Sequence, residues 1–171
     1  MKRKPIKIIT LAGCGVLAAG GCLFVALQFV PTGVSTTNPP VVAEPNWDSP
    51  ETRALAVRAC FDCHSNETTW PLYSRIAPFS WLVANDVREG RQALNFSEWG
   101  VPRTGGGEEG EGEERGEGGE RGEGGEGAGE AAEKVEDGTM PPALYTLIHP
   151  SARLTPDEQQ QLIDGLIRSL Q

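Results

Sequence analysis

The residues best suited to chemistry are two cysteines and a histidine in one short segment. Cys60, Cys63 and His64 form the pattern C-x-x-C-H. Two thiols three positions apart on a helical turn can form thioethers with the two vinyl groups of haem, and the adjacent imidazole can bind the iron from the same side. The spacing therefore predicts one covalently attached haem c, with His64 as the proximal iron ligand.

Three other uses of this cysteine pair compete with haem. A structural zinc site needs four ligands, but outside the apolar N-terminus the chain has no further cysteine, and its only other histidine is His149. A thioredoxin-like redox pair would follow a strand, whereas residues 50–59 have a helical pattern with Ser49 as N-cap and Pro50 at the first position. A disulfide is the third alternative, although a bridge across so short a loop adds little stability.

The second axial ligand of the iron has few candidates. Met1 is the first residue, so Met140 is the methionine available, and it lies between Thr139 and the backbone-restricting pair Pro141-Pro142. His149 and an open or water-filled position are the alternatives. A His/Met-ligated iron passes electrons, whereas an open sixth site favours peroxidase or gas-binding chemistry. Met140 thus favours an electron carrier over an enzyme, and a haem enzyme or sensor is the alternative function.

Further motifs accompany these residues along the chain. They are Asn38-Pro39-Pro40, Cys60 to Asn66, Trp70-Pro71-Leu72-Tyr73, Ile76 to Leu82, Asn95 to Trp99, Met140 to Tyr145 and His149-Pro150. With them the chain resembles the small bacterial haem-binding domain family related to cytochrome c. The resemblance implies a mostly helical c-type haem domain, with thioethers at Cys60 and Cys63 and iron ligands at His64 and Met140. It does not imply a particular redox partner.

Helices should position these residues. The apolar pattern predicts one from Pro78 to about Leu94, and Thr155-Pro156-Asp157-Glu158 is a capping box that opens a terminal helix. We expect that helix to pack on the one over 50–59, through an apolar face of Leu162, Ile163, Leu166, Ile167 and Leu170. Short helices are expected over 130–136 and 142–148, and candidate haem-wall aromatics are Trp70, Tyr73, Trp81, Trp99 and Tyr145. The predicted class is all-α, a small cytochrome c-like domain.

The N-terminus has the composition of a membrane anchor. Four basic residues precede an apolar run from Ile8 to Val30, which Pro31 ends. A helix of this length spans a bilayer, and the positive-inside rule places the basic tail in the cytoplasm and the haem domain in the periplasm or outside the cell. The alternatives are a cleaved signal peptide, with Ala18 and Gly20 as the small residues before the cut, and a lipobox at Leu11-Ala12-Gly13-Cys14.

Most of the acidity of the chain lies in one segment. Of the net charge of −9, residues 105–127 hold −7, because they comprise twelve Gly, nine Glu and two Arg. Such a run has no apolar surface to bury and is predicted to be disordered, either as a tether or as a docking element for a basic redox partner. No basic stripe favours nucleic-acid binding, and 171 residues exclude a large multi-domain enzyme. We expect an anchor (1–31), a linker (32–45), a haem-binding domain (46–102 and 132–171) and a disordered insertion (103–131).

Overall fold

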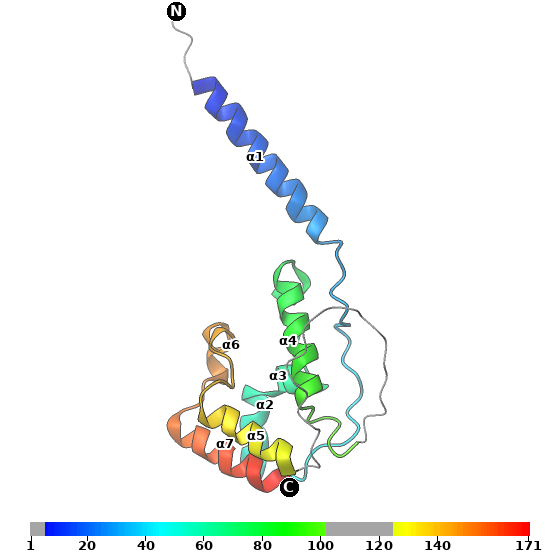
Figure 1. Cartoon of the computed structure of the whole chain (residues 1–171), viewed down its shortest axis with the longest axis vertical. Helices are drawn as coiled ribbons and strands as arrows, with labels where there is room; N and C mark the ends of the chain where they lie inside the picture. The colour runs from blue at the N-terminus through cyan, green and yellow to red at the C-terminus, as the bar shows by residue number, and fades with distance from the viewer. Residues whose placement is uncertain (1–5, 102–124) are drawn as a thin grey trace, which may run out of the picture. The chain divides into compact units, whose positions relative to one another are not determined.

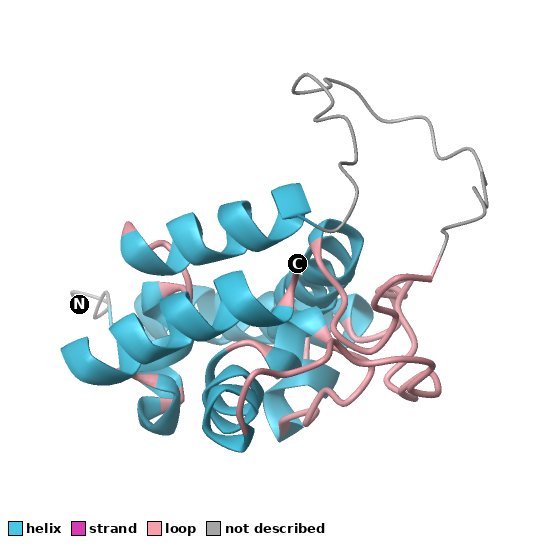
Figure 2. Cartoon of the chain, turned by 90° about the horizontal axis from the view of Figure 1, so that it is seen from below, coloured by secondary structure: helices cyan, strands magenta, loops and turns pink. Residues whose placement is uncertain are grey.

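The computed structural model of this chain describes residues 6–101 and 125–171. Within these ranges the elements are helices, with one isolated bridge between Ala43 and Glu98 and no strand, which confirms the all-α prediction (Figure 2). The chain divides into two units. One comprises Met1–Thr36 and Trp70–Arg88, and the other comprises Thr37–Thr69 and Glu89–Gln171.

The first unit contains the helix of the apolar N-terminal run. Its elements are α1 (Ile6–Leu27), the 3₁₀ helix η1 (Leu72–Arg75) and most of α4 (Phe79–Ala93), which the sequence predicted from Pro78 to Leu94. The Gln28 side chain accepts a hydrogen bond from the backbone N–H of Ala77 at 2.9 Å. In the described part of the chain, no helix combines the length and the hydropathy needed to cross a bilayer. The membrane anchor and its two alternatives stay predictions.

The second unit contains the remaining helices and both predicted helix caps (Figure 1). The Ser49 hydroxyl accepts a hydrogen bond from the Thr52 N–H at the start of α2, and Thr155 and Glu158 form the expected capping box. These caps satisfy backbone donors that have no partner inside the helix. The helices of this unit are α2 (Pro50–Ala59), α3 (Phe61–His64), α5 (Gly125–Glu136), α6 (Ala143–Ile148), the 3₁₀ helix η2 (Pro150–Ala152) and α7 (Pro156–Ser169).

Helix α7 packs on α2, as predicted, and also on α5, which runs beside it in the opposite direction (Figures 1 and 2). The shared core consists of Leu55, Ala56, Phe61, Phe96, Ala132, Val135, Leu162, Ile163, Leu166 and Leu170. The prediction was wrong for Ile167, which is 43% exposed. Successive helical residues are rotated by about 100°, so Ile167 turns away from the core when Leu166 faces it.

Helix α5 begins earlier than the sequence predicted. We expected a helix from residue 130 and a disordered insertion over 103–131, but the structure includes residues 125–131 in α5. Ala132 and Val135 on this helix are buried in the core. Packing of such an apolar face stabilises a helix more than composition alone indicates. The rest of the predicted insertion, residues 103–124, lies outside the described residues.

Candidate haem site

The C-x-x-C-H residues occupy the junction between α2 and α3. Cys60 ends α2, and its carbonyl accepts hydrogen bonds from the backbone N–H groups of Cys63 at 3.1 Å and His64 at 2.9 Å. Phe61, between the cysteines, is 2% exposed and belongs to the core. The two thiols and the imidazole therefore lie on one turn that a buried aromatic ring anchors.

The orientation of His64 is set by the backbone beyond the end of α4. Its Nδ1 atom lies 3.1 Å from the carbonyl oxygen of Leu94. A carbonyl oxygen only accepts hydrogen bonds, so Nδ1 is the donor and Nε2 keeps its lone pair. Histidines that bind metals usually donate their second N–H to such an acceptor, which fixes the ring and strengthens the ligand.

The electrostatic surroundings of His64 favour the neutral ligand form. Burial lowers the pKa of its imidazole, while hydrogen bonds to the backbone of Leu94 and Gly90 act in the opposite direction. The net shift is downward, so the ring is uncharged at neutral pH. A neutral imidazole is the form that binds a metal ion.

A buried polar network holds the loop that follows His64 in the sequence. The His64 carbonyl accepts a hydrogen bond from the Phe96 N–H at 2.8 Å. The Asn66 N–H donates to Ser97 Oγ at 2.9 Å, and the Asn95 amide donates to Asn66 Oδ1 at 3.0 Å. Each of these polar side chains is buried and hydrogen-bonded, so the loop after His64 is held against the loop after α4.

The two thiols are in the reduced form, without a disulfide between them. Burial, together with the nearby Cys63, raises the pKa of the Cys60 thiol to about 12. Cys60 is therefore protonated at neutral pH when no metal ion is bound to it. Among the described side chains, no group of three or more His, Cys, Asp or Glu is arranged to hold a metal ion.

Met140 lies in the loop between α5 and α6, with its N–H donating to the Lys134 carbonyl at 2.9 Å. The peptide bond from Met140 to Pro141 is cis. Met140 is partly buried and packs against the same core cluster as Cys60 and Leu94. The fold thus brings the predicted distal ligand to the core that also supports the cysteine turn.

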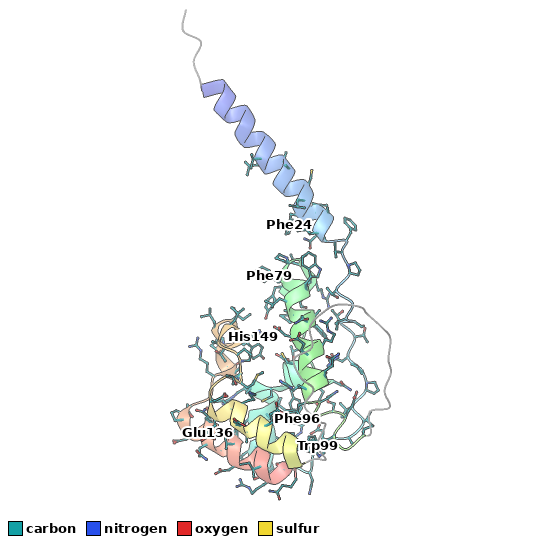
Figure 3. The ribbon with its side chains drawn as sticks, in the orientation of Figure 1. Phe24, Phe79, Phe96, Trp99, Glu136 and His149 are labelled. Carbon is teal, nitrogen blue, oxygen red and sulfur yellow. The ribbon has the colours of Figure 1, made fainter. Side chains whose placement is uncertain are left out.

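Helix α6 follows this loop and is tied to the cysteine turn by one side-chain hydrogen bond. The Tyr145 hydroxyl donates to Asp62 Oδ2 at 2.7 Å, and Asp62 Oδ1 accepts from the Thr69 N–H at 2.8 Å. The Tyr145 ring also stacks on His149, with 4.4 Å between ring centroids; His149 lies at the end of α6 (Figure 3). Sequence reasoning missed Asp62, since the variable positions of C-x-x-C-H gave no signal.

The described residues fit a haem. The cysteine turn presents two thiols and an imidazole whose Nε2 has a lone pair, which is the donor set that the C-x-x-C-H pattern requires. Helix α6 has no buried residue, and three of its apolar side chains, Leu144, Leu147 and Ile148, are more than half exposed. These exposed apolar side chains belong to the helix that Tyr145 joins to the cysteine turn, and apolar side chains suit the faces of a porphyrin.

The predicted haem-wall aromatics divide between the two units. Trp70, Tyr73 and Trp81 belong to the first unit, and their role at the haem stays a prediction. Trp99 packs against the core of the second unit, in the loop after α4 that also holds Phe96 (Figure 3). Trp47, which the sequence did not single out, packs 5.3 Å from Phe96 between ring centroids. The only sequence signal for this core position was that Trp47 is an aromatic residue just before the Ser49 cap.

Comparison with known proteins gives one match. A family model described as a haem-binding domain matches residues 22–167, which include both cysteines of the pair, His64 and Met140. No curated protein and no solved structure matches the chain.

Proposed function

This chain belongs to the haem-binding domain family and binds haem, and we propose that it is a membrane-anchored monohaem c-type cytochrome that transfers electrons. In this proposal Cys60 and Cys63 hold the haem through thioethers, and His64 and Met140 are the axial iron ligands. The bound haem supplies an iron that alternates between the ferric and ferrous states. The residues of this chain hold that iron and set how readily it accepts an electron.

The hydrogen bond from His64 Nδ1 to the Leu94 carbonyl is the observation that best supports the proposal. It leaves Nε2 as the donor atom on a ring that is neutral and fixed in place. An imidazole positioned in this way, one residue after Cys63, has the arrangement of a proximal ligand. A histidine with only a packing role would not need this donor geometry beside two reduced thiols.

Met140 as the second ligand favours electron transfer over catalysis. The Met140 thioether would fill the sixth position, so that oxygen and peroxide would not readily bind the iron, and it would also raise the reduction potential. Support comes from its place on the same core as Cys60 and from the loop that the Lys134 carbonyl holds. The electron donor and acceptor would be other proteins or complexes that meet the haem domain.

The location that we propose is the cytoplasmic membrane, with the haem domain in the periplasm or outside the cell. It rests on the basic residues before the apolar run from Ile8 to Val30 and on the positive-inside rule. Attachment of c-type haem through thiols also suits a compartment outside the cytoplasm. The apolar run would hold the domain near membrane-bound redox partners.

Covalent attachment can be tested on the full chain produced with a c-type haem maturation system. We expect the denatured wild-type protein to retain haem, with the mass of one haem added to the chain. The double variant Cys60→Ser/Cys63→Ser should lose it, while Cys22→Ser, a matched change at an exposed cysteine, should keep it. Absence of covalent haem from the wild type, or its retention in the double variant, would contradict the proposal.

A haem sensor or enzyme is a second candidate, favoured by the exposure of α6. This helix follows the Met140 loop and has no buried residue, so the segment could move and open the sixth position. Mixing the ferrous wild type with carbon monoxide separates the two functions. Ready binding would favour the sensor or enzyme, and slow or undetectable binding would favour the carrier.

A further inference from the structure

We propose that Gly90 is a positioning residue for His64, because the missing side chain lets the last turn of α4 dock directly on the cysteine turn. This inference rests on the proposed function in one respect, that His64 is an iron ligand. It goes beyond the proposed ligand set because it assigns a role to a residue that is not one of the four proposed haem-binding residues.

The backbone of Cys63 lies where a side chain at position 90 would begin. A Cβ atom built on Gly90 would lie 2.5 Å from the Cys63 carbonyl oxygen and 3.0 Å from both its carbonyl carbon and its Cβ. Two of these are backbone atoms of a hydrogen-bonded turn, so they cannot rotate away as the end of a flexible side chain can. Any other residue at position 90 must push α3 and α4 apart.

Glycine at this point has no local advantage. Position 90 is inside a helix of fifteen residues, where glycine is less favourable than every residue except proline. It is also buried, so solvent contact does not explain it. The close approach to Cys63 is the feature of the structure that requires it.

One turn of α4 connects Gly90 to the acceptor of the His64 proton. The Leu94 N–H donates to the Gly90 carbonyl at 2.9 Å, and the Leu94 carbonyl accepts from His64 Nδ1 at 3.1 Å. On the same turn, Arg91 Nε donates to the carbonyl of Ser65 at 2.8 Å. Residues 90, 91 and 94 thus hold the backbone on both sides of His64, and displacement at Gly90 would lengthen the bond to Nδ1.

That hydrogen bond affects the iron through the imidazole. A carbonyl that accepts the Nδ1 proton increases the electron density at Nε2, which stabilises ferric relative to ferrous iron. The negative end of the α4 dipole, at its C-terminus, acts in the same direction. Weakening the bond should therefore favour the ferrous form and raise the reduction potential.

Gly165 provides a matched control in the same unit. A Cβ atom there would lie 2.3 Å from Thr52 Oγ1, at the contact of α7 with α2. Gly165→Ala therefore introduces a comparable clash in a helix interior. The atoms that the new Cβ would meet belong to the side chain of Thr52. Thr52 is hydrogen-bonded to Ser49, whereas the His64 ring is hydrogen-bonded to Leu94, so this clash does not act on the bond of His64.

The test compares the reduction potentials of wild-type, Gly90→Ala and Gly165→Ala holoproteins, each purified as the full chain with covalent haem. We expect Gly90→Ala to shift the ferric–ferrous equilibrium severalfold toward the ferrous form, and Gly165→Ala to lower thermal stability while leaving the potential unchanged. Equal potentials for Gly90→Ala and wild type, or equal shifts in both variants, would overturn the proposal.

If Gly90→Ala yields no holoprotein, a measurement on the wild type tests the proposed role of Gly90 instead. Solvent exchange of the His64 Nδ1 proton, followed by NMR, should be slow because the Leu94 carbonyl holds it. Fast exchange would overturn the role of Gly90 while the haem and its ligands still stand. A wild type without haem bound to His64 would instead refute the proposed function, and the inference would fail with it.

Discussion

The two sides of the proposed haem site are held in different ways. On the proximal side, α3, the loop after it and residues 89–98 surround His64 with buried groups, including Phe61, Asn66 and Phe96. On the distal side, residues 137–149 include α6, which has no buried residue. The proximal side is part of the core, whereas the distal side is attached to it by Met140 and by the Tyr145–Asp62 hydrogen bond.

This difference indicates that the two proposed ligands are held in position by different means. The fold positions His64 through the polar network behind it and through the Leu94 carbonyl, before any haem is bound. No residue of the distal segment, 137–149, is buried, so the bond to the iron would itself help to hold Met140 in place. Loss of the proximal ligand should therefore abolish the site, and changes on the distal side should alter what the site binds.

The largest effect is expected for His64→Ala. Removing the ligand that the core positions should reduce the yield of holoprotein by at least about tenfold, since even the loss of a group that hydrogen-bonds to a metal ligand costs this much in metal affinity. His149→Ala is the control, because His149 lies on the exposed distal side. Haem content measured per chain checks the prediction, and equal losses in the two variants would remove the distinction between the sides.

Met140→Ala should leave haem attached and change its chemistry. Cys60, Cys63 and His64 are unaffected, so the haem content should match that of the wild type. The open sixth position should bind carbon monoxide in the ferrous state, and the reduction potential should fall because the thioether that raises it is gone. If the spectrum, potential and carbon monoxide binding are all unchanged, another residue is the distal ligand.

A smaller effect is expected for Tyr145→Phe, which removes the hydrogen bond to Asp62 and keeps the ring. A bond of this kind contributes about 1 kcal/mol, which corresponds to about a fivefold rise in the population with the distal segment displaced. Carbon monoxide should then bind the ferrous variant about fivefold faster than the wild type. Thr146→Val, which removes a hydroxyl that donates to the Ala143 carbonyl within α6, should have no effect. The same rate in both variants would show that Asp62 does not hold the distal segment.

The smallest effect concerns Glu44, in the segment that precedes α2. Its carboxylate accepts hydrogen bonds from Arg53 at 2.6 and 2.7 Å, and this interaction lowers the pKa of Glu44 below its ordinary value of 4.5. Because the folded-state pKa is lowered, Glu44 stabilises the fold above the unfolded-state pKa. This stabilisation is lost as the pH falls through the folded-state value.

Glu44→Gln should therefore lower the unfolding temperature slightly at pH 7 and by less at pH values below 4.5. The effect is small because both partners are partly exposed, so that water screens the pair. Glu51→Gln, at an exposed position of α2, serves as the control. A constant difference between wild type and Glu44→Gln across this pH range would contradict the assignment.

Local signals predicted the parts of the fold that depend on neighbouring residues. Ser49 and the Thr155–Glu158 capping box start helices as expected, because a cap acts within three residues. The early start of α5 was missed, since packing of Ala132 and Val135 overrides a Gly/Glu composition. The Tyr145–Asp62 bond joins residues 83 positions apart, and the Gly90–Cys63 contact depends on how two helices meet. No local pattern encodes either of them.

The absorption spectrum of the wild-type protein, oxidised and then reduced, tests all four proposed haem-binding residues at once. We expect a c-type spectrum in the reduced form and, in the oxidised form, the weak far-red band of ferric iron bound by methionine. These features together would support Cys60, Cys63, His64 and Met140 in their proposed roles. A covalent haem without the far-red band would contradict Met140 as the ligand, and a spectrum without c-type haem would contradict the whole account.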